Sequence, residues 1–218
     1  MSRKTTRTDG RKQGFFDPFP TGLPREARLA GKELGPYGFM NLRIAFFDMD
    51  RTLIDGDCDV SWKAFVIERG LAEPAEREEV ARFDDEFARG TPDIEAFLRF
   101  QLRQFRSRTL EELRPLLECH YRERVGPTIY PEARRTVRRY QERGIPAVLL
   151  TATNEAVAAP LARQFGFDAM LATRLELQDG RYTGGIVPPY CFASAKVEVA
   201  ERYCHSFGLS LRQAGYYG

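Results

Sequence analysis

Two aspartates, Asp48 and Asp50, stand two residues apart at the end of an apolar run, Leu42 to Phe47. Side chains at positions i and i+2 of a strand point the same way, so both carboxylates can face one crevice beyond the strand, where open α/β sheets bind ligands. Two carboxylates about 4 Å apart repel by roughly 1 kcal/mol in water and roughly 4 kcal/mol at an effective dielectric constant near 20. A cation such as Mg²⁺, which prefers oxygen ligands, would remove this repulsion. The alternative is a polar loop in which aspartate is only a turn former.

The residues around the aspartates favour the catalytic interpretation. The stretch FFDMDRTLIDGD resembles motif I, D-x-D-x-[TV], of the haloacid dehalogenase-like hydrolases, in the version found in their phosphoserine-phosphatase-like subgroup. Thr151, after the apolar run AVLL, is similar to motif II, and Lys196 in CFASAKVEVAERY is similar to motif III. The resemblance covers nearly all of residues 41–218 and contains three of the four family motifs in order.

The fourth family motif, an acidic pair after the last core strand, is not found in the sequence. The chain ends in GYYG, at the place where that pair should begin. We therefore expect the C-terminal part of the core to be truncated and the activity of this exact chain to be low. The resemblance leaves two alternatives: an active phosphatase, or a truncated or non-catalytic protein that lacks this metal-binding motif.

The resemblance also implies a role for each matched residue. Asp48 is expected to attack phosphorus and form an aspartyl-phosphate, while Asp50 acts as general acid and then as general base. Mg²⁺ is expected to contact Asp48 and the backbone carbonyl of Asp50. Thr151 is expected to bind a phosphoryl oxygen, and Lys196 to offset charge in the transition state. For a lysine alone in the first turn of a helix, the ordinary interpretation is a solvated surface residue.

Two further residues are expected to contact the substrate. Thr52 is the last residue of motif I. Asp57 matches a position where phosphoserine phosphatases carry a glutamate facing the substrate's amino group, and aspartate is one methylene shorter. The substrate implied is a small phosphorylated metabolite, an amine-bearing ester of the phosphoserine or histidinol-phosphate kind. The alternative for Asp57 is a residue of a mobile Gly-Asp loop.

The elements that must position these residues can be predicted from apolar periodicity. Residues 59–125 carry a helical pattern, with Thr91 as a candidate N-cap and Thr109 at the start of a later helix. By resemblance this segment is an inserted all-helical cap, and the alternative is helical packing without a role in substrate choice. Residues 126–218 alternate helices and strands, which predicts an α/β fold with a Rossmann-like parallel sheet covered on both faces.

The elements predicted in this second part are a helix at 131–143, strands at 145–150, 170–171 and 175–177, a two-residue hairpin turn at 179–180, helices at 154–165 and 194–207, and a last strand at 214–217. The predicted organisation is a core of residues 40–58 and 126–218, a cap of residues 59–125 and a disordered basic leader of residues 1–39.

The composition is ordinary for a soluble globular protein, with 43% hydrophobic and 29% charged residues in 218. Residues 1–39 carry eight Lys or Arg and four acidic residues, a net charge of +4, which leaves −2 for the rest of the chain. Nucleic-acid binding is therefore not expected of the body, because it depends on neutralising phosphates. The leader is either a functional basic arm or the product of a start codon assigned too early.

The cysteines and the hydropathy pattern bear on compartment and partners. Four cysteines without a CxxC pair, and no secretory signal, predict free thiols and a cytoplasmic protein. Cys119-His120 and Cys204-His205 are not expected to bind zinc, because adjacent helix residues diverge by about 100°. No run reaches the roughly 20 apolar residues of a membrane span. The sequence does not indicate an oligomeric state.

Overall fold

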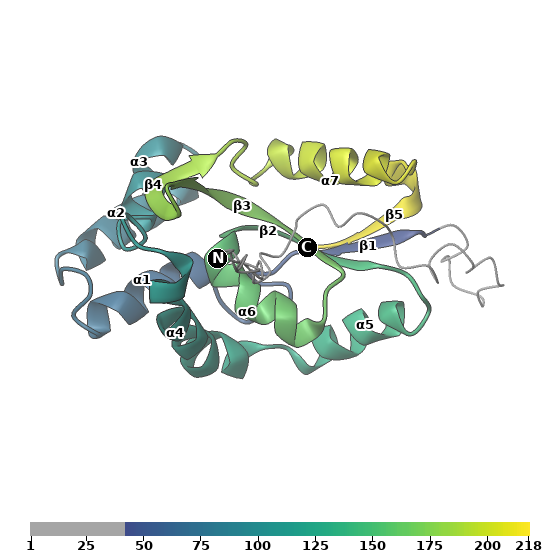
Figure 1. The fold of residues 1–218 in the computed structure, drawn as a ribbon, viewed down its shortest axis with the longest axis horizontal. Helices are drawn as coiled ribbons and strands as arrows, with labels where there is room; N and C mark the ends of the chain where they lie inside the picture. The colour runs from purple at the N-terminus through teal and green to yellow at the C-terminus, as the bar shows by residue number, and fades with distance from the viewer. Residues whose placement is uncertain (1–41) are drawn as a thin grey trace, which may run out of the picture.

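A five-stranded sheet forms the centre of the part of the chain that the computed structural model describes, residues 42–218 (Figure 1). The predicted leader, residues 1–39, lies outside the described residues. The strand order is β4-β3-β2-β1-β5. Strands β5, β1, β2 and β3 run parallel, and only β4 is antiparallel to its neighbour. The predicted α/β fold with a mainly parallel sheet is confirmed. The strands are β1 (Ile44–Phe47), β2 (Ala147–Asn154), β3 (Ala169–Gln178), β4 (Arg181–Val187) and β5 (Ala214–Tyr217).

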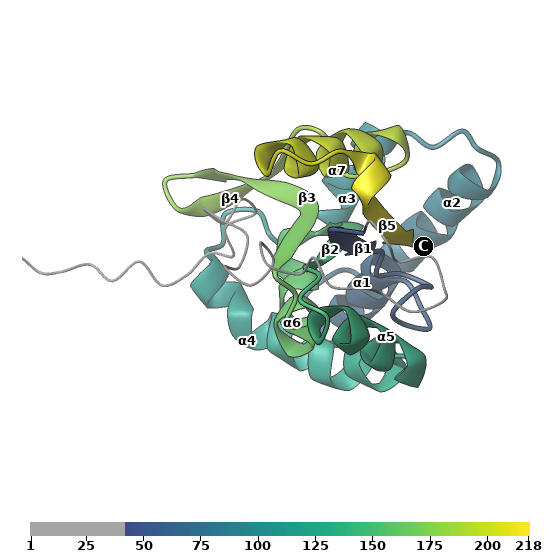
Figure 2. The same cartoon turned by 90° about the vertical axis from the view of Figure 1, so that its right-hand side faces the viewer.

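Helices cover both faces of the sheet, with α7 on one face and α5 and α6 on the other (Figures 1 and 2). The α-helices are α1 (Cys58–Glu68), α2 (Glu76–Ala88), α3 (Ile94–Gln101), α4 (Leu110–His120), α5 (Pro131–Gln141), α6 (Glu155–Phe165) and α7 (Ser194–Ser206). Shorter helical turns occupy Tyr121–Val125, Gly126–Thr128 and Leu211–Gln213. None of the helices in residues 42–218 is both long enough and apolar enough to cross a membrane.

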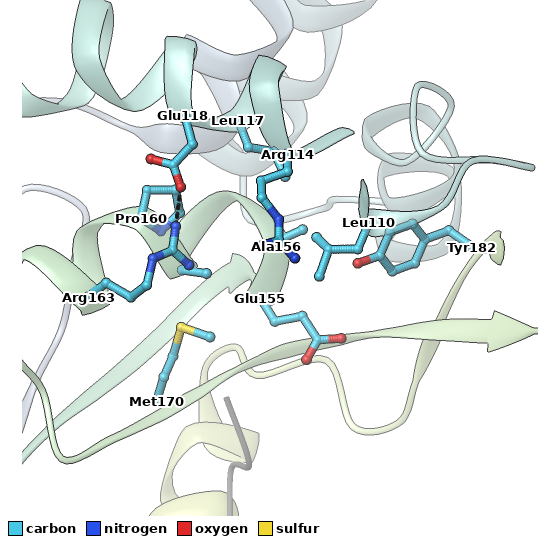
Figure 3. Close-up of a pocket in the computed structure, with 11 residues that line it drawn as sticks. Leu110, Arg114, Leu117, Glu118, Glu155, Ala156, Pro160, Arg163, Met170 and Tyr182 are labelled. Atoms are coloured by element: carbon cyan, nitrogen blue, oxygen red, sulfur yellow. Dashed lines mark hydrogen bonds and ion pairs between the residues drawn. The ribbon is translucent and has the colours of Figure 1, made fainter. Parts of the chain in front are cut away.

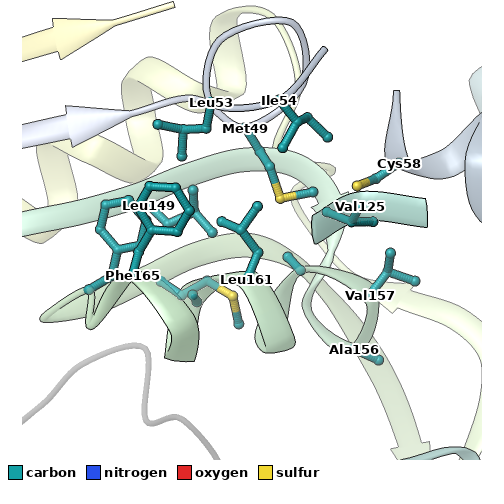
Figure 4. Close-up of a cluster of buried hydrophobic side chains, with 14 of the residues drawn as sticks. Met49, Leu53, Ile54, Cys58, Val125, Leu149, Ala156, Val157, Leu161 and Phe165 are labelled. Atoms are coloured by element: carbon teal, nitrogen blue, oxygen red, sulfur yellow. The ribbon is translucent and has the colours of Figure 1, made fainter. Parts of the chain in front are cut away.

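The core is divided by the sheet into two apolar layers. Ala45 and Phe47 of β1 face the layer under α5 and α6, while Ile44 and Phe46 face the layer under α7. This alternation follows from the two-residue period of a strand, and burial of both faces explains why β1 is apolar throughout. Figure 4 shows part of the first layer, in which residues from the loop after β1 pack on β2 and α6.

Four α-helices, α1 to α4, lie between β1 and β2 in the sequence, in the segment for which apolar periodicity predicts helices. Together they form the helical cap, beyond the carboxyl ends of the central strands (Figure 1). Helices α2 and α3 share a small apolar cluster of their own, built on Phe83, Phe97 and Phe100. This cluster is separate from the two layers of the core, and the buried Lys63 of α1 adds hydrogen bonds to Glu76 of α2 and to the Phe100 carbonyl of α3.

One predicted helix start is wrong and another is confirmed. Helix α3 is capped by Asp93, whose side chain accepts the N–H of Ala96 at 2.9 Å, and Thr91 lies outside the helix. An aspartate closer to the first turn supplies the cap, and aspartate is a somewhat better N-cap than threonine. Thr109 caps α4 as expected and forms a capping box with Glu112.

Two predicted strand boundaries differ from the structure. Strand β2 was expected to end at residue 150, but it continues to Asn154 with a register shift against β3. The extension contains Thr151 and Thr153, whose branched side chains suit a strand. The two segments predicted near residues 170 and 176 form one strand, β3, that pairs with β4 through the predicted hairpin turn. Asp179 and Gly180 both have positive φ, as a type I′ turn requires.

Candidate active site

A cavity of about 660 Å³ lies between the carboxyl ends of β1 and β2 and the helical cap. Asp48 and Asp50 reach it from the loop after β1, Ala152 from β2, and Lys196 from the first turn of α7. The cap closes the opposite side with residues of α1, α2 and α3. Three segments that are distant in sequence therefore meet at one edge of the sheet, where a ligand site is expected.

Asp48 is held on both carboxylate oxygens. Its Oδ1 accepts the backbone N–H of Met49 at 2.8 Å, and its Oδ2 lies 2.7 Å from Lys196 Nζ. The two side chains are only 19% and 16% exposed, so their attraction is less screened than that of a surface pair. The Tyr216 hydroxyl donates a longer bond, 3.5 Å, to the same Oδ2. The predicted proximity of Asp48 and Lys196 is what the structure shows.

Asp50 is also paired on both oxygens, but by different partners. Its Oδ1 accepts the N–H of Cys58 at 2.8 Å, and its Oδ2 accepts the Thr153 hydroxyl at 2.7 Å. Burial, helped by the charge of Asp57, raises the pKa of Asp50 to about 6, although these hydrogen bonds oppose the shift. Such a carboxyl group exchanges a proton readily near neutral pH, as a general acid and base must.

The loop between the two aspartates and α1 is folded tightly around one carbonyl. The carbonyl of Met49 accepts the N–H groups of Thr52, Leu53 and Ile54, and Arg51 adopts a positive φ of 57°. The side chain of Thr52 lines a different hollow, beside Tyr130 and Tyr217. The structure therefore does not bring Thr52 to the cavity that holds Asp48.

Asp57 serves two purposes at the start of α1. It is the N-cap of that helix, since its Oδ1 accepts the N–H groups of Asp59 and Val60 at 3.1 and 3.2 Å. It also lines the cavity, with its Oδ2 3.9 Å from an Nη atom of Arg51. The cap role fixes the side chain, so the alternative of a mobile loop residue does not describe this structure.

Thr151 lies deeper than the other predicted residues. It is fully buried in β2, and its hydroxyl oxygen accepts the N–H of Thr153 at 3.1 Å. A hydroxyl that accepts a bond still carries a hydrogen of its own to donate. The neighbouring residue Ala152, rather than Thr151, lines the cavity. The structure therefore does not place Thr151 among the residues that line the cavity.

Several cavity residues were missed in the sequence. Thr153 holds Asp50, and the signal was available, because residues 151 and 153 of one strand point the same way. Asp84 and Gln101 of the cap also line the cavity, as do aromatic residues from both sides. The helical periodicity of the cap assigns such residues to a face, but it does not say which face meets the core.

The donor set around Asp48 fits a magnesium ion. Mg²⁺ is usually held by one or two carboxylates together with waters and substrate phosphate oxygens, rather than by a full protein cage. Asp48 offers a carboxylate and Asp50 a backbone carbonyl. Within residues 42–218 no group of three or more His, Cys, Asp or Glu side chains could hold a metal.

A second cavity, of about 450 Å³, lies between α4, α6 and β3 (Figure 3). It is lined by apolar side chains together with Arg114, Glu155 and an ion pair between Arg163 and Glu118. Glu155 is occupied, since it accepts the N–H of Leu175 at 2.9 Å. None of the predicted site residues lines this cavity, whereas Asp48, Asp50, Asp57 and Lys196 all line the cavity around Asp48.

Comparison with known proteins gives consistent matches. The family described as haloacid dehalogenase-like hydrolase matches residues 45–218. A histidinol-phosphatase of Neisseria meningitidis is 32% identical over 174 residues, which are 79% of this chain and 78% of that protein. Phosphoserine phosphatase SerB1 of Mycobacterium tuberculosis is 28% identical over 207 residues, which are 91% of this chain. The match covers 65% of that relative, which is less than two thirds of its length. A solved structure of a protein of unknown function from Bordetella pertussis Tohama I has a TM-score of 0.73 and 34% identity, covering 80% of this chain and 79% of that one.

Proposed function

This chain belongs to the haloacid dehalogenase-like hydrolase family, and from that membership we propose that it is a phosphatase that hydrolyses a small phosphate monoester through an aspartyl-phosphate on Asp48. The observation that carries the proposal is the 2.7 Å pair between Asp48 and Lys196, which lines a cavity large enough for a metabolite. A nucleophilic carboxylate beside a fixed cation is what attack on a phosphate dianion requires.

The first step is attack by a carboxylate oxygen of Asp48 on phosphorus. The Met49 N–H fixes one oxygen of this carboxylate, and the Lys196 ammonium offsets the negative charge that nucleophile and phosphate bring together. Thr151, which precedes the cavity residue Ala152 in β2, accepts a hydrogen bond and keeps its own hydroxyl hydrogen, which in the proposed step is donated to a phosphoryl oxygen. The bond from phosphorus to the ester oxygen breaks as the bond to Asp48 forms.

Asp50 handles the proton in both steps. With a pKa of about 6 it can give a proton to the leaving alkoxide, and the resulting carboxylate can then take a proton from the water that hydrolyses the aspartyl-phosphate. The Thr153 hydroxyl and the Cys58 N–H hold the carboxyl group at a fixed orientation throughout. Its position two residues from Asp48 places acid and nucleophile on the same side of the strand end.

Magnesium is the cofactor that this donor set favours. Asp48 and the backbone carbonyl of Asp50 would hold it, and when bound it would neutralise charge on the phosphoryl oxygens.

The substrate that fits best carries an amino group near its phosphate. Asp57 lines the cavity with a fixed carboxylate, and Asp84 and Asp59 line the same cavity. Relatives are described as a histidinol-phosphatase and a phosphoserine phosphatase, and both phosphate esters so named carry an amino group. A protonated amine would lower the electrostatic cost of placing the carboxylates of Asp57 and Asp84 on one cavity.

The test is hydrolysis of p-nitrophenyl phosphate with Mg²⁺ by the wild type, Asp48→Asn and Asp55→Asn. Loss of the nucleophile should lower kcat/KM by at least about 1000-fold. Asp55 is exposed and bonds the Tyr130 hydroxyl at 3.1 Å, so its replacement should change the rate by less than about 2-fold and controls for charge in the same loop. Equal rates for all three proteins, or no hydrolysis by the wild type, would contradict the proposal.

A further inference from the structure

One buried polar side chain in the wall of the cavity lacks a partner. Gln101, the last residue of α3, is 5% exposed and lines the cavity around Asp48. Its side-chain oxygen, Oε1, makes no hydrogen bond within residues 42–218. A buried acceptor without a donor costs about 1–3 kcal/mol, and buried polar atoms of folded proteins are nearly always paired. An unpaired acceptor at the wall of a substrate cavity is therefore a candidate contact for a donor group of the substrate.

The backbone at the end of α3, which carries Gln101, is anchored by hydrogen bonds of neighbouring residues. The carbonyl of the preceding residue, Phe100, accepts a 2.9 Å hydrogen bond from Lys63, which is fully buried. Lys63 also donates to Glu76 at 2.8 Å and to Gln104 at 2.7 Å, so the end of α3 is tied to α1 and α2. The terminal torsion of glutamine remains soft, which lets the oxygen turn toward a donor that enters the cavity.

The charges in the same cavity indicate which kind of donor is expected. Asp57 and Asp84 both line it, and the charge of Asp57, after desolvation, contributes to raising the pKa of Asp84. Asp59 also lines it, but burial raises the pKa of Asp59 well above its ordinary value, so Asp59 is not counted as a charge here. Arg51 is the cation on that side, but its side chain is 81% exposed and lies 3.9 Å from Asp57. The cap side of the cavity thus carries more negative than positive charge. A cationic donor is favoured over a neutral hydroxyl.

Aromatic rings complete the surroundings of Gln101. Phe83, Phe87 and Phe97 from the cap and Phe192 from the loop before α7 line the cavity. The rings of Phe87 and Phe192 meet edge to face with centroids 5.9 Å apart, so cap and core are in contact at the cavity wall. Aromatic faces attract organic cations, and a dry wall strengthens both that attraction and a hydrogen bond to Gln101.

We propose that Gln101 determines specificity by accepting, through Oε1, a hydrogen bond from a protonated nitrogen in the leaving group of the substrate, with Asp57 and Asp84 supplying the opposing charge. The substrate class is the phosphate monoesters of amino alcohols. This inference rests on the proposed phosphatase function and adds to it the residue that recognises the cation.

The experiment compares two esters of nearly equal size, O-phosphoethanolamine and ethylene glycol monophosphate, with p-nitrophenyl phosphate as a third substrate. The proteins are the wild type, Gln101→Met, which keeps the volume but removes the acceptor, and Gln101→Glu, which keeps an acceptor and adds charge. Thermal unfolding of each protein checks that the cap remains folded. The wild type should prefer the amine-bearing ester in kcat/KM.

Gln101→Met should lower kcat/KM for O-phosphoethanolamine by about 10-fold or more, while the values for the two other esters change by less than about 3-fold. Gln101→Glu should retain the preference for the amine. A parallel pair tests the charge: Asp84→Asn should reduce the preference, whereas Asp85→Asn, whose side chain pairs with Arg89 at the surface, should not.

The outcomes separate this inference from the function on which it rests. Hydrolysis of p-nitrophenyl phosphate without a preference for the amine-bearing ester would overturn the inference alone. The same holds if Gln101→Met lowers all three rates equally, because that is the result of a purely structural role. Failure of the wild type to hydrolyse any of the three esters would overturn the phosphatase function, and the inference with it.

Discussion

The two sides of the cavity differ in how their polar atoms are paired. On the cavity floor, defined as Asp48, Asp50, Thr153 and Lys196, all four carboxylate oxygens have a partner within 2.8 Å. On the cavity roof, defined as Asp57, Asp84, Gln101 and the aromatic residues of α2 and α3, Gln101 Oε1 has no partner within residues 42–218. If the proposed function holds, the floor needs no new partner before the substrate binds, whereas Gln101 on the roof gains its partner from the substrate.

The difference follows from the elements that carry each side. The floor stands on the ends of buried parallel strands and on the first turn of α7, which pack into two large apolar layers. The roof stands on helices with a small aromatic cluster of their own. A rigid core can hold reacting groups to within a fraction of an ångström, and a thin helical layer can change its lining residues with little effect on the core.

The largest expected effect is on the floor, with Asp50→Asn. Removal of the acid and base should lower steady-state turnover of an alkyl phosphate by about 100- to 10,000-fold, equivalent to about 3–5 kcal/mol. With p-nitrophenyl phosphate the leaving group needs no proton, so only the hydrolysis of the intermediate should be slow. Stopped-flow measurement should then show a burst of nitrophenolate followed by slow turnover.

Two results would break this assignment for Asp50. One is an equal loss for both kinds of ester without a burst. The other is a peptide containing Asp48 that carries no extra phosphoryl mass after the variant has been quenched during turnover. Either result would mean that Asp50 does not catalyse hydrolysis of an aspartyl-phosphate on Asp48. The two residues could then no longer be described as a preassembled pair of nucleophile and acid.

The next largest expected effect is on the stability of the helices that carry the roof, and the variant that tests it is Lys63→Met. Lys63 is fully buried and makes three hydrogen bonds. Its removal leaves the 7%-exposed Glu76 without its buried cation, although Gln104 Nε2 still donates to Glu76 Oε2 at 3.3 Å. The free energy of unfolding should fall by about 3–5 kcal/mol in urea titrations. The double variant Lys63→Met with Glu76→Leu should recover most of this loss, because an apolar pair can replace a buried ion pair.

A second measurement on Lys63→Met compares its turnover of an amine-bearing ester with its turnover of p-nitrophenyl phosphate. At a temperature where Lys63→Met is still folded, the preference for an amine-bearing ester should weaken, since the end of α3 has lost its anchor. Turnover of p-nitrophenyl phosphate should change much less. Equal changes for both substrates would mean that floor and roof are not separate in the way described.

The floor could largely be predicted from the sequence, and the roof could not. Asp48 and Asp50 follow an apolar strand at a spacing of two, so local geometry alone places their carboxylates together. Lys196 is nearly 150 positions away, and only the order of the family motifs connected it to Asp48. Thr153 was missed although it obeys the same spacing rule relative to Thr151.

The roof residues could not be predicted from the sequence because their contacts depend on packing between helices that are distant in the chain. Gln101 faces the cavity because α3 is held at a particular angle by Lys63 and by an aromatic cluster, and no local pattern contains that angle. Asp57 was predicted as a substrate contact but not as the N-cap of α1, which is the role that fixes it. Competition between caps likewise explains why Asp93, and not Thr91, begins α3.

A smaller effect concerns acid stability of the cap. His120 of α4 is 1% exposed, lies 2.8 Å from the Ser61 hydroxyl and packs against Trp62. Burial, helped by the charge of Arg124, lowers the pKa of His120 from 6.5 to about 4. Above pH 6.5 the residue is neutral in both the folded and the unfolded state. As the pH falls from 6.5 toward 4, the unfolded state takes up the proton first, so stability is lost.

At pH 5 this loss should be about 2 kcal/mol relative to pH 7. The measurement is the free energy of unfolding at both pH values for the wild type and His120→Gln, since the other titrating groups cancel in the difference. The variant should lose about 2 kcal/mol less than the wild type between the two pH values. Identical losses would mean that acid acts on the cap through other groups.

The smallest predicted effect tests whether cap stability and substrate recognition can be separated. Thr109→Ala removes the N-cap of α4, on the part of the cap that does not line the cavity, and should lower the free energy of unfolding by about 1 kcal/mol. Thr109→Ser, which keeps the hydroxyl, should restore it. Because neither the floor nor Gln101 is touched, the ratio of kcat/KM between amine-bearing and neutral esters should stay within about 2-fold of the wild type. A marked change in that ratio would show that any loosening of the cap alters recognition, and Gln101 would then be one of several residues through which the cap acts.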